Sequence, residues 1–359
     1  NFPTGSALTN RVVISNAVTV MAVSANPADT LIVGRDHQNG TNGPAAVRCV
    51  YMNTAVNSRL IGFTITNGHT LVETTSSGSG GGVYCSSTLA NGSYVSNCII
   101  VGNMAWGEGP YSGGGGGGYK GNYYSCIISY NACGRYGGGG GYGVLVSNCT
   151  ISCNSAQNGS GGGLYYSTAY NCILRYNIAA SGGGGGCGTY VNCLISNNST
   201  PGYGGGVVGG SSVPGQMVGC TIEDNSCDGY GAGAGLTGSG WSFYNCVFRR
   251  NRAQATGGGC CFYGSPYLTN CLIVDNPGGA FYNNCYAFNC TIVSNGMGLY
   301  QGGVASNCII YSTAAGNVRS GFTYNIGNSC VDTGTVACTI IGTGNITNNP
   351  LFMDPTNAN

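Results

Sequence analysis

The chain has 359 residues and a formal net charge of +1, and only 6% of its residues are Asp, Glu, Lys or Arg, against about 25% in an ordinary globular domain. With a formal charge of +1 and a single lysine, Lys120, the chain offers no basic face for nucleic acid, which argues against nucleic acid as a partner. No apolar run approaches the ~20 residues that a transmembrane helix needs, which argues against insertion into a membrane. Few charges and abundant Gly, Asn, Ser and Thr favour an extracellular or cell-surface protein; with no signal or anchor in view, we expect a mature or trimmed segment.

The first 70 residues are expected to form short β-strands. The segment "RVVISNAVTVMAVSANPADTLIV" (11–33) alternates Val and Ile with other residues and shows no amphipathic helix. His37 and His69 lie in this region without companion residues at metal-ligand spacing, so we interpret them as loop or surface residues. We predict N-terminal coils of a β protein over 1–70.

Residues 80–313 repeat one motif. "NCIIVGN" (97–103) returns in varied form nine more times, and glycine clusters followed by an aromatic or β-branched run separate most of the copies. The cysteines of successive copies are 18 (Cys290 to Cys308) to 28 (Cys98 to Cys126) residues apart, which is the period of a solenoid coil with about three short strands and three turns.

The residues at the regular positions of the repeat select a fold. Gly, Val, Ile, Tyr and Thr in these positions exclude helical repeats, and a leucine framework is absent. We therefore predict an all-β fold, one right-handed, single-stranded parallel β-helix of about a dozen coils with Gly-rich turns. It spans 1–359 as a single domain, with irregular C-terminal coils over 314–359.

Within each copy, the cysteine and the residue two positions later point to one face, which we predict to be the core. Free cysteine behaves as a small buried hydrophobe, and no CxxC pair is present, so we expect no metal and no other cofactor. The predicted core column consists of Cys98, Cys126, Cys149, Cys172, Cys193, Cys220, Cys246, Cys271, Cys290 and Cys308.

Disulfides are considered only outside this column. The two candidate pairs are Cys133 with Cys153 and Cys330 with Cys338. The total of 21 cysteines is odd, which leaves at least one of them free or intermolecular.

The asparagine that closes nine of the copies is predicted to stack at a turn. Asparagine tolerates left-handed backbone, and its amide can bond to the amide of the equivalent residue one coil away. A second asparagine column immediately precedes the cysteines. The predicted ladder consists of Asn103, Asn131, Asn154, Asn177, Asn198, Asn225, Asn251, Asn276 and Asn295.

Charged residues gather at outward positions of three successive copies. Glu223 precedes Arg249, and Asp224, Arg250 and Asp275 follow one another at the next position, so we predict an ion-pair ladder on the surface. Mutual neutralisation is a simpler interpretation of these charges than a calcium or sugar site or a pair of hydrolytic carboxylates. No catalytic residue is assigned.

Tyrosines interleave with the glycine clusters. Aromatic columns on a β-helix can stack on sugar rings or pack between molecules, so we predict a contact face. Its residues are Tyr119, Tyr123, Tyr136, Tyr142, Tyr165 and Tyr166.

The repeated "GGG…NCxIxxN" pattern, "RCVYMNTAVNSRLIGFTITNG" (48–68) and "GNITNNPLFMDP" (344–355) resemble a known family. It comprises the secreted right-handed β-helix proteins of the choice-of-anchor type from environmental bacteria, which have a pectate-lyase-like fold. The resemblance covers nearly the whole chain and implies the fold and export, whereas a fold by itself does not carry an activity.

The two ends of a parallel β-helix are strand edges, which solenoids ordinarily cover with polar caps. Both ends of this chain are strand-like without such a cap. We therefore predict a non-enzymatic extracellular structural protein that stacks head to tail with its own copies into a filament or surface fibre. A cell-surface adhesin or carbohydrate-binding β-helix is the alternative and a polysaccharide lyase or hydrolase the third hypothesis, so the expected partners are other copies of the chain or glycans.

Overall fold

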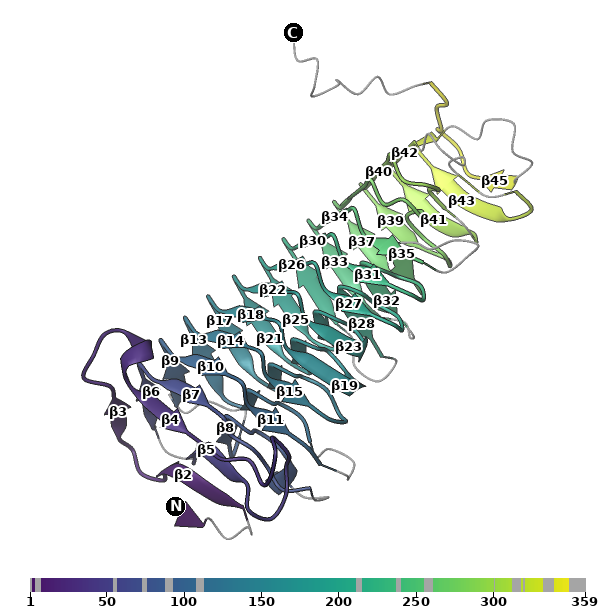
Figure 1. Ribbon diagram of the computed structural model, residues 1–359. Helices are drawn as coiled ribbons and strands as arrows, with labels where there is room; N and C mark the ends of the chain where they lie inside the picture. The colour runs from purple at the N-terminus through teal and green to yellow at the C-terminus, as the bar shows by residue number, and fades with distance from the viewer. Residues whose placement is uncertain are drawn as a thin grey trace.

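The computed structural model is an elongated stack of coils built from short β-strands (Figure 1). Each strand pairs with the strand one coil earlier and the strand one coil later, so the stack is a parallel β-helix. The structure describes residues 2–3, 8–53, 57–72, 76–87, 93–107, 113–210, 215–236, 240–254, 261–299, 301–311, 318, 320–331 and 339–348.

Within the described residues the chain runs in turn through four sheets, which we number 1 to 4. Sheet 1 contains β1 (Phe2–Pro3), β2 (Thr9–Ile14), β5 (Val47–Met52), β8 (Val83–Cys85), β12 (Gly118–Tyr119), β16 (Gly141–Tyr142), β20 (Leu164–Tyr165), β24 (Gly185–Gly186), β28 (Val207–Gly209), β32 (Ala234–Leu236) and β36 (Phe262–Tyr263). Sheet 2 contains β3 (Thr19–Met21), β6 (Arg59–Ile61), β9 (Tyr94–Ser96), β13 (Asn122–Tyr124), β17 (Leu145–Ser147), β21 (Thr168–Tyr170), β25 (Thr189–Val191), β29 (Gln216–Val218), β33 (Ser242–Tyr244), β37 (Tyr267–Thr269), β39 (Tyr286–Phe288), β41 (Gly303–Ser306), β43 (Thr323–Gly327) and β45 (Thr339–Ile341). Sheet 3 contains β4 (Leu31–Val33), β7 (Thr64–Thr66), β10 (Ile99–Val101), β14 (Ile127–Ser129), β18 (Thr150–Ser152), β22 (Ile173–Arg175), β26 (Leu194–Ser196), β30 (Thr221–Glu223), β34 (Val247–Arg249), β38 (Leu272–Val274), β40 (Thr291–Val293), β42 (Ile309–Tyr311) and β44 (Cys330–Val331). Sheet 4 contains β11 (Met104–Ala105), β15 (Ala132–Cys133), β19 (Ser155–Ser160), β23 (Ile178–Ser181), β27 (Ser199–Thr200), β31 (Ser226–Cys227) and β35 (Arg252–Ala253).

Two departures from this pattern occur near the N-terminal end. Strand β1 pairs antiparallel with β2, whereas the other strand pairs of the four sheets are parallel. Two short 3-10 turns, η1 (Pro27–Asp29) and η2 (Ser76–Gly78), lie between strands. Sheets 2 and 3 continue from coil to coil as far as β45 and β44, whereas sheet 1 ends at β36 and sheet 4 runs only from β11 to β35.

The expectation of three strands per coil is wrong for the middle of the stack, where sheet 4 adds a fourth. Most of its strands are only two to four residues long and follow the ladder asparagine directly, as β15 follows Asn131. They pair in register, with Ala132 opposite Ser155 and Cys133 opposite Ala156. The turn that closes each motif therefore leads into a further short strand that residue patterning does not separate from a loop.

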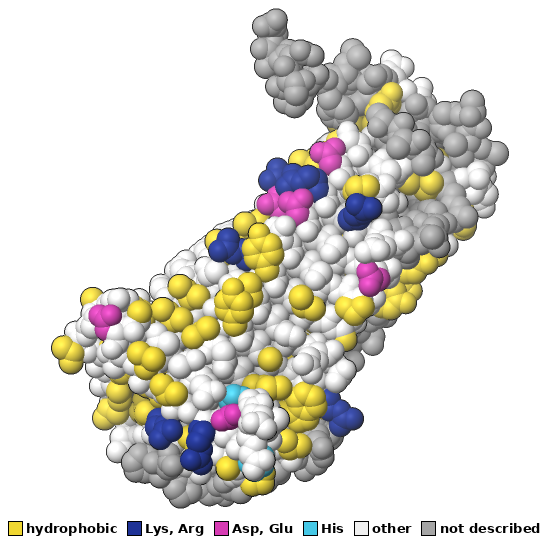
Figure 2. Space-filling model, viewed as in Figure 1, with side chains coloured by type: hydrophobic (Ala, Val, Ile, Leu, Met, Phe, Trp, Pro, Cys, Tyr) yellow, Lys and Arg dark blue, Asp and Glu magenta, His cyan; other side chains and the backbone are white. Residues whose placement is uncertain are grey.

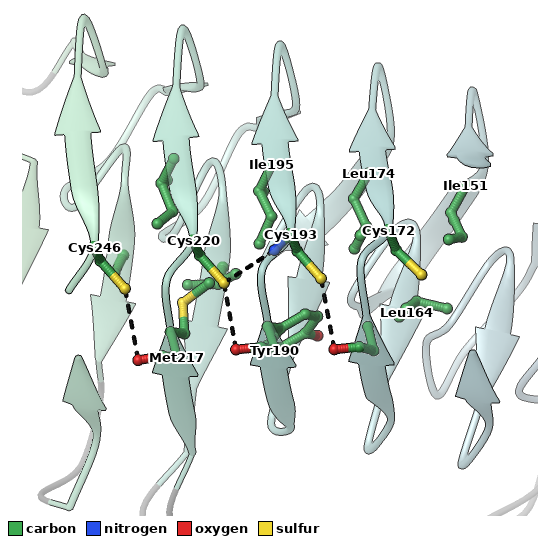
Figure 3. Close-up of a cluster of buried hydrophobic side chains, with 14 of the residues drawn as sticks. Ile151, Leu164, Cys172, Leu174, Tyr190, Cys193, Ile195, Met217, Cys220 and Cys246 are labelled. Carbon is green, nitrogen blue, oxygen red and sulfur yellow. Dashed lines mark hydrogen bonds between the residues drawn. The ribbon is translucent and has the colours of Figure 1, made fainter. Parts of the chain in front are cut away.

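The core is filled by side chains that repeat in register from coil to coil (Figure 3). Ile100, Ile128 and Ile151 face one another in adjacent strands of sheet 3 and are fully buried. Large side chains of sheet 2 are matched by glycines of sheet 1. A Cβ at Gly185 would lie 2.3 Å from the hydroxyl of the buried Tyr190, so glycine is required where that ring crosses the core.

The ten cysteines of the repeat are buried in one column at the turn between sheets 2 and 3. The thiol of Cys172 accepts a hydrogen bond from the backbone N–H of Cys149 (3.4 Å) and donates to the carbonyl of Tyr170 (3.2 Å). Figure 3 shows the sulfurs of neighbouring coils pointing the same way, with that of Cys220 also 3.3 Å from the carbonyl of Tyr190. Each thiol thus satisfies backbone groups of the turn.

A serine takes over this role at the C-terminal end of the column. The hydroxyl of Ser329 accepts a hydrogen bond from the N–H of Cys308 (3.0 Å) and donates to the carbonyl of Gly327 (2.8 Å). The position therefore requires a small side chain that both donates and accepts, because the turn leaves one N–H and one carbonyl inside the protein.

The nine asparagines form a continuous buried column at the turn that follows each strand of sheet 3 from β10 to β40. The Oδ1 of Asn177 accepts from both the N–H and the Nδ2 of Asn154, each at 3.0 Å. Its Nδ2 donates to the Oδ1 of Asn198 and to the carbonyl of Ile151, again at 3.0 Å. The same pattern links every neighbouring pair from Asn103 to Asn295.

The expectation that the ladder asparagines adopt left-handed backbone is wrong. None of the nine has a positive φ, whereas the residue before each of them does, as Tyr176 (φ 55°) does before Asn177. The second asparagine column is left-handed instead, as at Asn171 (φ 52°) before Cys172. The left-handed residue bends the chain and faces outward, which lets the next side chain point into the core.

Candidate binding surface

Tyrosines form a stacked column on the outer face of sheet 1. The rings of Tyr51, Tyr84, Tyr119 and Tyr142 follow one another with centroids 5.1 to 5.6 Å apart and planes within 12° of parallel. Tyr165 continues the column with a tilted ring. Because each face lies against the next ring, the faces of these rings are not free to stack on a sugar. The prediction of Tyr119 as a contact residue is wrong, because its side chain is buried between the neighbouring rings.

The remaining tyrosines of the predicted contact face do not form one surface. Tyr166 is exposed, but its ring lies 4.4 Å from that of Tyr165, and Tyr136 is half-buried. The prediction for Tyr123 is wrong, because this side chain is fully buried. It lies in line with Val95 and Val146, and a Cβ at Gly118 would come within 2.5 Å of its hydroxyl.

A different set of exposed aromatic and aliphatic side chains lies on the outside of sheets 2 and 3, and we call it the aromatic array. It has three rows, one from each of three successive coils. The first row is Tyr124, Ile127 and Tyr130; the middle row is Ser147, Thr150 and Cys153; the third row is Tyr170, Ile173 and Tyr176. All six residues of the outer rows are exposed, and the middle row is small.

Sequence reasoning missed the array because it followed the tyrosines next to the glycine clusters. The signal is nevertheless present in the repeat, where a tyrosine immediately precedes the ladder asparagine in "SYN" (129–131) and "RYN" (175–177). That position is left-handed and faces outward in every coil, so a tyrosine there is necessarily on the surface. Tyr130 and Tyr176 are 67% and 53% exposed.

Four of the five predicted surface charges meet in one group of ion pairs (Figure 2). The Nε of Arg249 lies 2.6 Å from Glu223, and the Nη2 of Arg250 lies 2.7 Å from Asp224 and 3.1 Å from Glu223. The Arg250 guanidinium holds the pKa of the Asp224 carboxyl below its usual value. The placement of Asp275 in this ladder is wrong, because Arg250 turns back toward the two carboxylates of the preceding coil and makes no ion pair with Asp275.

The predicted disulfide between Cys133 and Cys153 is wrong. Cys133 and Cys153 are both free thiols, the first buried inside sheet 4 and the second at an outward turn, so they do not form a disulfide. Burial raises the pKa of the Cys133 thiol to about 12. Cys338 of the other candidate pair lies outside the described residues.

Metal-binding groups and membrane-spanning helices are both absent from the described residues. The described residues contain no group of three or more His, Cys, Asp or Glu side chains placed to hold a metal ion. His37 and His69 lie in N-terminal loops and bond to backbone groups of these loops. In the part of the chain that the structure describes, no helix has the length and apolar character needed to cross a membrane.

Comparison with known proteins identifies the fold. Residues 146–297 match the family model described as a right-handed β-helix region. The fold is a right-handed parallel β-helix. The crystal structure of PfbA, a surface adhesin of Streptococcus pneumoniae, is similar at 11% sequence identity and a TM-score of 0.32, over 82% of this chain and 84% of that one. This likeness is too low to carry a functional argument, and a search of curated proteins gives no match.

The comparison and the strand pairing together confirm the predicted fold class. Successive copies of the motif do lie one above another as predicted. The family match covers the centre of the stack, which includes the third row of the aromatic array and the ion-pair group, but not the first row.

Proposed function

We propose that the protein is a non-enzymatic extracellular β-helix that binds other surface molecules through its side wall, as an adhesin or a carbohydrate-binding scaffold does. The observation that carries this proposal is the aromatic array, which exposes four tyrosines and two isoleucines on regular, in-register strands. Exposed apolar patches on a soluble protein mark interaction sites when they are contiguous. The resemblance to secreted choice-of-anchor proteins supports the location.

Binding of the labelled monomeric chain to a glycan array and to isolated cell walls tests this function. Retention on at least one class of glycan or wall is expected, with the heat-unfolded chain as a control for non-specific adhesion. Failure of the folded monomer to bind any of these surfaces would contradict a binding role.

Head-to-tail assembly into a filament is a second candidate. The first strands of sheets 2 and 3, β3 and β4, expose Met21, Leu31 and Val33, and Val18 and Val23 flank β3. Apolar side chains on an edge strand favour pairing with another chain. Negative-stain electron microscopy and light scattering over a wide concentration range test it: fibres that disappear in Met21→Asp support assembly, and a monomer at all concentrations excludes it.

A polysaccharide lyase or hydrolase receives less support from the geometry. Glu223 and Asp224 are both engaged by arginines, and the lowered pKa of Asp224 keeps it ionised. A carboxylate that must act as a general acid needs a raised pKa. Cleavage of a uronic-acid polymer that is lost in Asp224→Asn would restore this hypothesis.

A further inference from the structure

A pocket of about 240 Å³ lies near the N-terminal end of the β-helix, beside β11, the first strand of sheet 4. Its walls come from the loop between β4 and β5, from the segment that follows β7 and from the segment that contains β11. None of the lining residues belongs to the aromatic array. They are Gly40, Thr41, Asn42, Val72, Met104 and Trp106.

The loop between β4 and β5 is held in place by hydrogen bonds. The N–H of Gly40 donates to the carboxylate of Asp36 (2.6 Å), and its carbonyl lies 3.2 Å from the Nε2 of the buried His69. The N–H of Gly43 donates to the carbonyl of Thr70 (3.0 Å). This wall is therefore already ordered, which lowers the entropic cost of binding a ligand against it.

The indole ring of Trp106 supplies a flat wall whose position is fixed. A Cβ at Gly134, in the next coil, would lie 2.3 Å from the Cε3 of this ring, so the ring packs directly on the backbone of Gly134. The backbone N–H of Trp106 donates to the hydroxyl of Thr70 (2.9 Å). These contacts hold the indole beside Met104 on the lining of the pocket.

The polar groups of the lining already have partners within the protein. The Oδ1 of Asn42 accepts the N–H of Thr70 (2.8 Å), and the hydroxyl of Thr41 donates to the carbonyl of Gln38 (2.5 Å). A polyol would bring several hydroxyls that this lining does not match, and each unmatched buried hydroxyl costs free energy. The six lining residues carry no charge, so an ion would lose its hydration without a matching charge. The lining therefore favours an uncharged ligand with few polar groups.

Size and contact chemistry narrow the ligand further. An apolar cavity of about 150 Å³ is large enough to bind benzene, so a pocket of about 240 Å³ accommodates one aromatic ring or two fused rings. Trp106 offers a ring and Met104 a thioether, and both attract an aromatic ring beyond the burial of apolar area. An aliphatic molecule of the same size gains only the burial.

We propose that this pocket binds a small uncharged aromatic compound of one or two rings, held against the indole of Trp106 and the thioether of Met104. This site is separate from the side wall of the proposed function. Loss of one leaves the other standing.

Fluorine NMR of 5-fluoroindole in the presence of the folded chain tests the site. We expect a saturable shift and broadening of the fluorine signal, with a dissociation constant of about 1 mM or tighter. Indole should displace the probe, and cyclohexanol, which is similar in size to one ring but not aromatic, should compete about tenfold more weakly.

Two variants change the pocket in opposite ways. Trp106→Ala removes the flat wall and should weaken binding about tenfold. The remaining tryptophan of this variant, Trp241, is fully buried, so an unchanged fluorescence emission maximum shows that the chain is folded. Val72→Trp keeps Trp106 and fills the pocket, and binding should be lost.

Val33→Trp is the matched control, because Val33 is 41% exposed and Val72 39%, but Val33 does not line the pocket. Unchanged binding by this variant supports the proposal. It is overturned if the fluorine signal shows no saturable change, if cyclohexanol competes as well as indole, or if Val33→Trp weakens binding as much as Val72→Trp. It is also overturned if folded Trp106→Ala binds as the unmodified chain does. Displacement by N-acetyltyrosinamide but not by indole would assign the pocket to a side chain of another protein and overturn the assignment to a free compound.

Discussion

Two columns of residues lie side by side in the same turn of the β-helix and differ completely in composition. The inner column is asparagine in all nine coils from Asn103 to Asn295. The outer column, one residue earlier in each coil, contains Gly102, Tyr130, Cys153, Tyr176, Asn197, Asp224, Arg250, Asp275 and Ser294. Each column keeps one backbone conformation from coil to coil, left-handed in the outer column and not in the inner one, yet only the inner column is uniform, so a repeated backbone conformation alone does not explain its composition.

The two columns differ in the groups with which their side chains form hydrogen bonds. An inner side chain has no water, and its partner is the equivalent residue of the next coil, so a change in one coil leaves groups in two others unsatisfied. An outer side chain faces solvent, which satisfies any polar group placed there. The inner column therefore holds the coils together, and the outer column is free to carry tyrosines in one part of the molecule and charges in another.

The largest expected effect comes from breaking the inner column. Asn177→Ala removes four buried hydrogen bonds, each 3.0 Å long, to Asn154, Asn198 and Ile151. Each buried group left without a partner costs about 1–3 kcal/mol, so we expect the free energy of unfolding to fall by about 4 kcal/mol or more. Urea unfolding monitored by circular dichroism measures the loss, and hydrogen exchange should show faster opening of the coils on both sides. A loss below about 1 kcal/mol would contradict the assigned role of the column.

A smaller effect is expected at the cysteine column. Cys172→Ala removes the acceptor of the Cys149 N–H and should lower the free energy of unfolding by about 1–2 kcal/mol. Cys172→Ser should cost less, because Ser329 already makes the same two bonds at the end of the column. The pair of variants, measured under the same conditions, separates the need for a hydrogen bond from the need for sulfur. Equal losses in the two variants would show that packing of the sulfur dominates.

The ion pairs on the outside should contribute less still. Arg250→Gln breaks an exposed pair with Asp224 and is expected to cost below about 1 kcal/mol, less in 1 M salt. Because the folded pKa of Asp224 is lowered, the pair stabilises the protein above the usual carboxyl pKa of about 3.9, and this stabilisation is lost as the pH falls through the folded pKa. Thermal unfolding of the unmodified chain and the variant should therefore converge at acid pH, and a difference that grows on acidification would refute this.

The smallest effect on stability is expected at the exposed tyrosines. Tyr176→Asn exchanges one outer residue for another that the same column already uses at Asn197, and we expect the midpoint of thermal unfolding to stay within the error of the measurement. A large drop would place Tyr176 in the packing of the β-helix and remove it from the binding surface.

The interior could be predicted from the sequence because alternation within each motif fixes it. Once a cysteine is assigned to the core, the residue two positions later is also expected to be buried, and Ile128 and Leu174 are buried. The alternation fails where a left-handed residue interrupts it. Counting back from Cys126 by two would place Tyr124 inside, but Ser125 (φ 51°) reverses the direction, so that Tyr123 is buried and Tyr124 exposed.

The binding surface could not be predicted in the same way, because outward positions have no partner that constrains them. The register of the coils was needed to show that Tyr130 and Tyr176 bracket Cys153 at three equivalent turns. The ion pair between Arg249 and Glu223 could be predicted from the sequence, because opposite charges at matching positions of adjacent motifs indicate a contact by themselves. Tyrosines at matching positions have no opposite charges that would indicate such a contact.

The asparagine column also bears on how such a chain can grow. Asn154 and Asn177 are 23 residues apart and make identical contacts with the coils before and after them. A segment that begins and ends at two equivalent turns would make the same asparagine bonds with its new neighbours, so duplication of the gene segment for one coil would lengthen the protein without interrupting this column. The uniform column thus fixes the register of neighbouring coils and lets coils be added or lost as whole units. Each added coil brings its own outer residues, on which selection can act.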